Sequence, residues 1–260
     1  MHIQEVTSRT MRLLISTEDR TETFNASGFL ISEEGGIHLY TCWHVVSGVD
    51  WHNISPLLPP KRRRWLSLVS QHVEVLPGLT KLGGTHSFEI DLYPQGEPIW
   101  EMERTTRPAP DLNAIGIQVP NVIDMVRIPV AFPFDELCFD RSELANFMVT
   151  TGDDLLLSGF PYGYSALGEY SPAPVVLKRS LASHRYLSPT VGLLDGAGFE
   201  GMSGCPVFAK VGDQYWLYGM YNGRIFPDAS LKHKPTDQLA ALGYVTTMFG
   251  ARAFMGLLPS

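Results

Sequence analysis

The chain has 260 residues, of which 44% are hydrophobic and 18% are charged, and its formal net charge is −7. This is the composition of a globular protein that is long enough to bury a substantial core. The negative charge does not favour nucleic acid or an anionic membrane as a partner, and no apolar stretch reaches the length of a membrane span.

The beginning of the chain has neither the basic start nor the apolar stretch of a secretory signal. The three cysteines are Cys42, Cys138 and Cys205, an odd number without the spacing of a metal or redox motif. We therefore expect a reducing, cytoplasmic location, no disulfide framework, no metal and no cofactor.

The apolar patterning predicts many short strands, and the 24 glycines and 19 prolines suit the turns between them. In chain order, strands are expected at 11–15, on both sides of the turn 33–36, and at 65–69, 72–76, 86–93, 98–103 and 112–119. A short helical turn is expected near 142–147, further strands from 155 to about 247, and a helix over 248–258.

The most informative motif is Gly-Met-Ser-Gly-Cys-Pro-Val-Phe at 201–208. The glycines beside Ser203 permit backbone conformations that a Cβ would forbid, and the proline suits the first residue of a following strand. This pattern is typical of a nucleophilic serine on a tight turn, although an ordinary turn serine would also fit it.

A histidine and an aspartate precede Ser203 in matching contexts. His44 directly follows an apolar strand, and Asp111 begins the apolar stretch 111–119. Asp91 also lies in a strand-like stretch between His44 and Ser203, so it is an alternative to Asp111. The order His, Asp, Ser is that of the chymotrypsin-type triad, whereas subtilisins and α/β-hydrolases order these residues differently.

Six blocks in this order resemble the trypsin-like serine peptidases, and their style is similar to the compact protease domain of the bacterial HtrA proteins. The blocks are Ser-Gly-Phe-Leu-Ile at 27–31, Thr-Cys-Trp-His-Val-Val at 41–46, Asp-Leu-Asn-Ala-Ile at 111–115, Gly-Phe-Pro-Tyr-Gly at 159–163, the stretch 195–204 around the serine, and Tyr-Gly-Met-Tyr-Asn at 218–222.

The resemblance implies an all-β fold of two six-stranded antiparallel barrels, with the active site between them and a C-terminal helix. The N-terminal barrel would span 1–135 and carry the histidine and the aspartate. A linker at 136–152 would lead to the C-terminal barrel and helix at 153–260, with the serine.

The resemblance also implies the roles of the site residues. Ser203 would be the nucleophile, His44 the base and Asp111 the residue that orients it, with the amides of Gly201 and Ser203 as the oxyanion hole. The substrate-binding positions would be Ala197 at the base of the primary pocket, Glu200, Asn222 as a support for the aspartate, and Gly223 and Arg224 along the substrate backbone.

Two residues depart from the family pattern. Met202 stands where trypsin has an aspartate that pairs with a newly cut N-terminus, so activation by such a cut is not expected. Cys205 replaces the usual glycine and is expected to be a buried, inert thiol. We expect other means of ordering the site, such as a partner or an oligomer. No peptide-sensing PDZ-like extension is recognised.

We therefore predict a serine endopeptidase that acts on protein or peptide substrates and is regulated or latent in the cytoplasm. The alternative is a non-catalytic scaffold or peptide-binding protein that keeps the fold. An esterase is a third candidate, because the same machinery cleaves esters. The basic run Lys-Arg-Arg-Arg at 61–64 is interpreted as a solvated loop rather than a nucleic-acid site.

Overall fold

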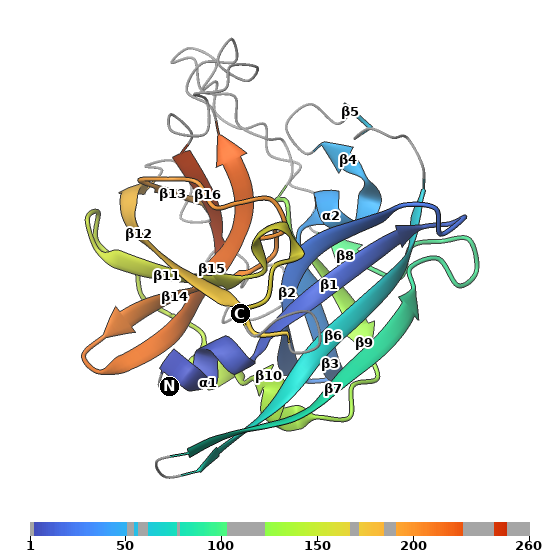
Figure 1. Cartoon of the computed structure of the whole chain (residues 1–260). Coiled ribbons are helices and arrows are strands. Elements are labelled where there is room, and N and C mark those ends of the chain that lie inside the picture. Colours follow the sequence, from blue (N-terminus) through green and yellow to red (C-terminus); the bar gives the residue numbers. More distant parts are fainter. Residues whose placement is uncertain are drawn as a thin grey trace.

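The structure is a computed structural model that describes residues 3–50, 55–56, 62–76, 79–102, 123–166, 172–184, 191–225 and 242–248. These residues form mostly β-structure, in an eight-stranded sheet from the N-terminal part of the chain and a closed barrel from the C-terminal part (Figure 1). The chain is therefore mostly β, as the sequence predicts.

The strands of the first sheet are β1 (Thr10–Thr17), β2 (Thr23–Glu33), β3 (Gly36–Thr41), β6 (Arg63–Leu76), β7 (Leu79–Asp91), β8 (Glu101–Met102), β9 (Val126–Val130) and β10 (Cys138–Phe139). Their order is β7-β6-β1-β2-β3-β9-β8, and β10 pairs with β2. Within the described residues this sheet does not close, so the six-stranded N-terminal barrel expected from the sequence is not what the structure shows.

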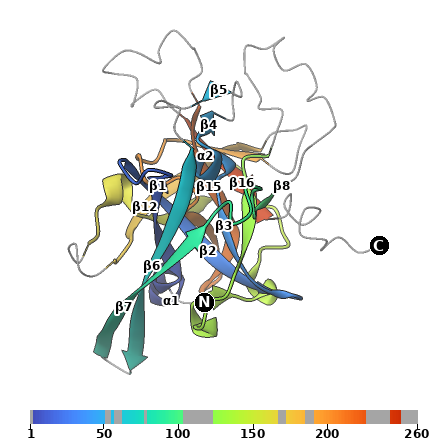
Figure 2. The same ribbon diagram turned by 90° about the vertical axis from the view of Figure 1, so that its right-hand side faces the viewer.

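The first sheet includes a long hairpin of β6 and β7. The sequence predicts separate strands at 65–69 and 72–76, but they form one strand, β6, with an irregular register between Gln71 and Val73. β6 and β7 extend together past the rest of the sheet as a twisted ribbon, which is visible in two perpendicular views (Figures 1 and 2).

The closed barrel has the order β11-β12-β13-β16-β15-β14. Its strands are β11 (Asp154–Gly159), β12 (Val175–His184), β13 (Val191–Leu194), β14 (Pro206–Val211), β15 (Gln214–Ile225) and β16 (Leu242–Thr247). The six-stranded C-terminal barrel is thus confirmed. The strand expected at 112–119 lies outside the described residues, and so does the C-terminal helix apart from its first residue.

The remaining elements are short: the helices α1 (Ile3–Ser8) and α2 (Trp43–Ser47), the strands β4 (Val49–Asp50) and β5 (Ser55–Pro56), and the 3-10 turns η2 (Asp135–Leu137), η3 (Arg141–Glu143) and η4 (Pro161–Gly163). η3 confirms a helical turn near its expected position. None of the helices in the described ranges is long and apolar enough to cross a membrane.

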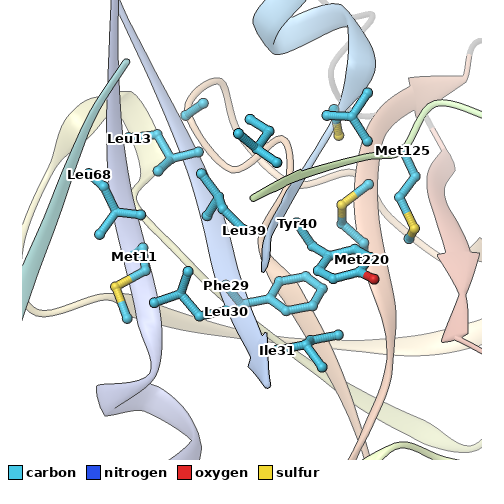
Figure 3. Packing of buried hydrophobic residues seen from close by; sticks show 14 of the residues in the cluster. Met11, Leu13, Phe29, Leu30, Ile31, Leu39, Tyr40, Leu68, Met125 and Met220 are labelled. Atoms are coloured by element: carbon cyan, nitrogen blue, oxygen red, sulfur yellow. The ribbon is translucent and has the colours of Figure 1, made fainter. Parts of the chain in front are cut away.

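The sheet and the barrel share one apolar cluster, and the barrel has a second cluster of its own. Alternate residues of β1, Met11, Leu13 and Ile15, are fully buried, as expected for a strand with one face on a core. Met220 of β15 belongs to the same cluster, and Figure 3 shows it beside Tyr40 of β3. Because the two units pack through common side chains, they hold residues from both in fixed positions.

The described arginines of the basic run at 61–64 contact other residues of the protein. Arg62 stacks on the ring of Tyr93 at 3.6 Å, and Arg64 forms an ion pair with Asp91 at 2.9 Å. Arg63 is only 8% exposed. The expectation of a solvated loop is therefore wrong for Arg63, and the described cations of this run already have intramolecular partners.

Candidate active site

His44 lies in the first turn of α2, directly after β3. The helix ends at Gly48, whose φ of 71° is left-handed and whose amide donates to the carbonyl of His44. The buried Arg63 donates from one Nη to the carbonyls of His44 (2.9 Å) and Val45 (2.7 Å), and burial lowers its pKa to about 10. This guanidinium gives the His44 carbonyl a second donor and provides a charged donor to the Val45 carbonyl at the end of the helix.

Asp124 binds His44 with both carboxylate oxygens. Oδ2 lies 2.7 Å from Nδ1 of the imidazole, and Oδ1 accepts from the backbone amide of His44 at 2.9 Å. The Asp124 side chain is fully buried, whereas that of His44 is 16% exposed. This geometry places the ring proton on Nδ1 and leaves Nε2 free to accept a proton from another group.

Asn222, on β15, joins this pair to the barrel. Its Nδ2 donates to the carbonyl of Asp124 at 2.5 Å, and its Oδ1 accepts from the amide of Thr246 at 2.7 Å. Its own carbonyl lies 3.5 Å from Oγ of Ser203. Asn222 is fully buried, so it fixes the aspartate on one side and borders the serine on the other.

The acid at His44 is not the one singled out from the sequence. Asp111 lies outside the described residues. Asp91, the alternative, pairs with Arg64 on the surface and does not contact His44. Sequence reasoning missed Asp124, although it stands just before the apolar alternation of β9, the same kind of signal that favoured Asp111.

Cys42 lies close to His44 and Asp124. Its thiol donates to the carbonyl of Tyr221 at 3.4 Å, and burial, with Asp124 nearby, raises the pKa of Cys42 well above its usual range. The ligand atoms of Cys42, His44 and Asp124 lie within 4.8 Å of one another, which a metal ion could bridge. However, a protonated thiol and a hydrogen-bonded histidine–aspartate pair fit a proton-transfer site better than a thiolate metal site.

Ser203 lies on a turn that requires glycine on both sides. Gly201 and Gly204 each have a φ of 87°. A Cβ would lie 2.4 Å from the carbonyl oxygen of Phe160 at the first glycine and 2.2 Å from that of Ser27 at the second. The backbone of β2 and the barrel therefore enclose the turn closely, and the sequence interpretation of these glycines is supported.

The residues before Ser203 form a type II turn. The amide of Met202 donates to the carbonyl of Phe199 at 3.1 Å, and Gly201 occupies the third position with its positive φ. Within the described part of the chain, the amides of Gly201 and Ser203 donate to no protein acceptor. Two unpaired donors beside the serine hydroxyl are what an oxyanion hole requires.

The Ser203 turn is ordered by the packing of Met202, whereas in trypsin an ion pair of the aspartate at this position orders it. Met202 is fully buried in the barrel core together with Cys205 and Leu157. Burial also raises the pKa of the Cys205 thiol, so it remains a neutral core residue at physiological pH. An apolar anchor at Met202 therefore replaces a charged one.

Two side chains contact the segment expected to form the primary pocket. Arg179 donates to the carbonyl of Ala197 from Nε (3.3 Å) and Nη2 (2.9 Å). The amide of Gly198 donates to the hydroxyl of the buried Tyr221 at 2.7 Å. A Cβ on Gly198 would lie 3.0 Å from the Tyr221 ring, so the tyrosine fills the space next to this segment.

The other positions expected to bind substrate lie around this segment. Glu200 is exposed, and its carbonyl accepts from the amide of Tyr162 at 2.5 Å. Gly223 and Arg224 are half-buried on β15, where the register with β16 is irregular between Tyr221 and Gly223.

His44 and Ser203 are not directly hydrogen-bonded in the part of the chain that the structure describes. The hydroxyl of Ser203 is instead within 3.5 Å of the Asn222 carbonyl. Catalytic hydrogen bonds are often long in proteins without substrate and shorten when it binds. The structure thus brings together His44, Asp124, Asn222 and the Ser203 turn in one site, in which His44 and Ser203 are not hydrogen-bonded to each other.

A closed barrel that carries a serine turn, packed on a sheet that carries a histidine–aspartate pair, belongs to the trypsin-like class of folds. Comparison with solved structures bears this out. The structure of HBP matches with a TM-score of 0.52 at 11% identity, over 98% of this chain and 94% of that chain. The scabies mite inactivated protease paralogue S-I1 matches with a TM-score of 0.51 at 14% identity, over 98% and 95%.

The active form of the Rv3671c protease from M. tuberculosis also matches, with a TM-score of 0.49 at 13% identity over 99% of this chain and 84% of that chain. No protein-family model matches the sequence, and no curated protein sequence matches it significantly. The two matches with TM-scores above 0.5 establish a trypsin-like fold, and at their low identities they do not establish catalysis.

Proposed function

We propose that the protein is a serine endopeptidase in which Ser203 is the nucleophile, His44 the general base and Asp124 the residue that orients the base. The observation that carries this proposal is the bidentate contact of the buried Asp124 with the ring and amide of His44. A buried carboxylate in this position fixes the tautomer and stabilises the imidazolium that forms during catalysis.

In the proposed reaction, Oγ of Ser203 attacks the carbonyl carbon of a peptide bond while Nε2 of His44 takes the hydroxyl proton. The carbonyl oxygen becomes an oxyanion and is bound by the amides of Gly201 and Ser203. When the tetrahedral intermediate collapses, His44 gives its proton to the departing amine. Water, activated by the same histidine, then hydrolyses the ester on Ser203.

From the contacts of this pocket segment with Arg179 and Tyr221, we infer that it accepts a small residue on the acyl side of the cleaved bond. Arg179 binds the carbonyl of Ala197 and Tyr221 binds the amide of Gly198, so both side chains are bulky neighbours of this segment. We expect glycine, alanine or serine at this position.

Labelling with a small fluorophosphonate tests the proposal. The wild-type protein should gain one adduct, located on Ser203 by mass spectrometry, and the variants Ser203→Ala and His44→Ala should gain none. Purified wild-type protein that remains unlabelled, both alone and after cell extract is added, would argue against a catalytic site.

A non-catalytic peptide-binding protein is the second candidate. It is favoured by the missing hydrogen bond between His44 and Ser203, and an inactivated protease paralogue matches the same fold. Cell extract separates the two candidates, because a latent enzyme that awaits a partner or oligomer would become labelled and a scaffold would not. An esterase would be labelled in either case and is separated by its failure to cleave peptides.

A further inference from the structure

Two exposed aromatic rings lie next to the turn that presents the oxyanion amides. Tyr162 is 61% exposed and Phe199 is 40% exposed. Their ring centroids are 6.0 Å apart at an interplanar angle of 44°, although the residues come from different segments. Single exposed apolar residues are common, whereas two neighbouring exposed rings beside a candidate active site are a candidate for a binding surface.

The backbone beneath the rings is fixed. The amide of Tyr162 donates to the carbonyl of Glu200 at 2.5 Å, and that of Gly163 donates to the carbonyl of Phe160 at 3.0 Å. A Cβ on Gly163 would lie 2.4 Å from Oδ1 of Asn25, so the turn η4 fits closely against β2. The rings are therefore presented to solvent by a well-packed turn.

Tyr162 has a φ of 54°, and only one other non-glycine residue among those described has a positive φ. Side chains rarely adopt this left-handed conformation, because the Cβ crowds the backbone. Such strain persists where the surroundings impose it, and it is concentrated at ligand sites. A glycine would adopt the same backbone more readily, but it would provide no ring.

Phe199 begins the type II turn whose third residue is Gly201, and its carbonyl accepts from the amide of Met202. A polypeptide whose carbonyl enters the amides of Gly201 and Ser203 must therefore pass close to the rings. Two tilted rings provide both a face and an edge for an apolar or aromatic side chain.

We propose that Tyr162 and Phe199 form an aromatic subsite that selects polypeptides with an aromatic or large aliphatic side chain within a few residues of the bound carbonyl. The inference rests on the proposed function only in taking a polypeptide as the ligand of the Ser203 turn. It holds for an enzyme and for a peptide-binding protein alike.

The test uses a randomised library of synthetic peptides and immobilised Ser203→Ala protein, which binds without cleaving. The retained peptides should be enriched about fivefold or more in Phe, Tyr, Trp and Leu, as expected when a few aromatic residues dominate binding. The enrichment should disappear when the protein also carries Tyr162→Gly or Phe199→Ala. Val211→Ala, which alters an equally exposed apolar residue at the far end of β14, should leave the enrichment unchanged.

Tyr162→Gly separates a binding effect from a folding defect, because glycine relieves the left-handed strain and should not lower the thermal unfolding temperature. Enrichment that is absent from the Ser203→Ala protein, or that survives both ring substitutions, would overturn the proposal. Failure of the proposed function has a different readout, which is the lack of a fluorophosphonate adduct on the wild-type protein.

Discussion

The hydroxyl of Ser27, on β2 of the first sheet, donates to the carbonyl of Gly201 in the barrel at 2.8 Å. The same hydroxyl accepts from the amide of Phe160 at 3.1 Å, and the Ser27 amide donates to the carbonyl of Ser203 at 2.9 Å. One fully buried serine therefore holds the Ser203 turn against the sheet that carries His44.

Ser27→Ala should lower both stability and the rate of fluorophosphonate labelling. The substitution leaves the Phe160 amide and the Gly201 carbonyl without this partner, at a cost of about 1–3 kcal/mol of unfolding free energy. Urea unfolding and labelling kinetics measure the two effects. Ser16→Ala removes an exposed hydroxyl contact with Thr23 and should change stability by about 0.5 kcal/mol or less. Equal effects of the two substitutions would show that Ser27 has no special role.

Arg63→Met should lower stability by about 2–3 kcal/mol, because two carbonyls at the end of α2 lose a charged donor inside the protein. Labelling of Ser203 should slow as well, since α2 positions His44. Arg62→Met is the matched control: Arg62 donates to the Gly96 carbonyl and stacks on Tyr93 from an exposed position, so this loss should cost about 1 kcal/mol or less. Unfolding in urea compares the two variants, and an Arg63→Met protein as stable as Arg62→Met would contradict the helix-end role.

Much of the fold follows from local patterns in the sequence. Alternation in β1 and the glycine turn between β2 and β3 predict those strands, and the glycines beside Ser203 predict the tight turn that carries this serine. The length of β6 was missed because an irregular register interrupts its alternation at Gln71. Whether the first sheet closes depends on long-range pairing, which single-sequence patterns do not encode.

The orienting acid could not be chosen from the sequence. Asp91, Asp111 and Asp124 all stand near apolar, strand-like stretches, and their local contexts do not separate them. What distinguishes Asp124 is a contact that forms only in the folded protein. Asn222, almost a hundred residues later in the chain, holds Asp124 against His44. The role of Arg63 was missed for a similar reason, since a basic run usually indicates a solvated segment.

Stability should fall as the pH rises above the ordinary thiol pKa of 9.0, because burial raises the pKa of Cys42 and Cys205 in the folded protein. The unfolded thiols ionise above pH 9.0 while the folded ones stay neutral, so the unfolded state gains stability there. The stabilisation is complete below pH 9.0 and is lost toward the folded pKa, by about 1.4 kcal/mol per pH unit for each thiol.

Cys205→Ala should make this decline shallower by about 1.4 kcal/mol per pH unit. Urea unfolding of the variant and the wild type between about pH 8 and pH 10 measures the difference in slope. A wild-type protein whose stability does not decline more steeply than that of the variant would contradict the raised pKa of the buried thiol.

The pairing of Asp124 with His44 is the central claim, and the rate of fluorophosphonate labelling of Ser203 in Asp124→Asn and Asp111→Asn tests it most directly. An amide at residue 124 would stabilise the wrong tautomer of His44, so Asp124→Asn should slow labelling about 10³–10⁴-fold. Asp111→Asn should stay within about twofold of the wild type, since Nδ1 of His44 already has its partner. Slow labelling of Asp111→Asn together with normal labelling of Asp124→Asn would contradict the account.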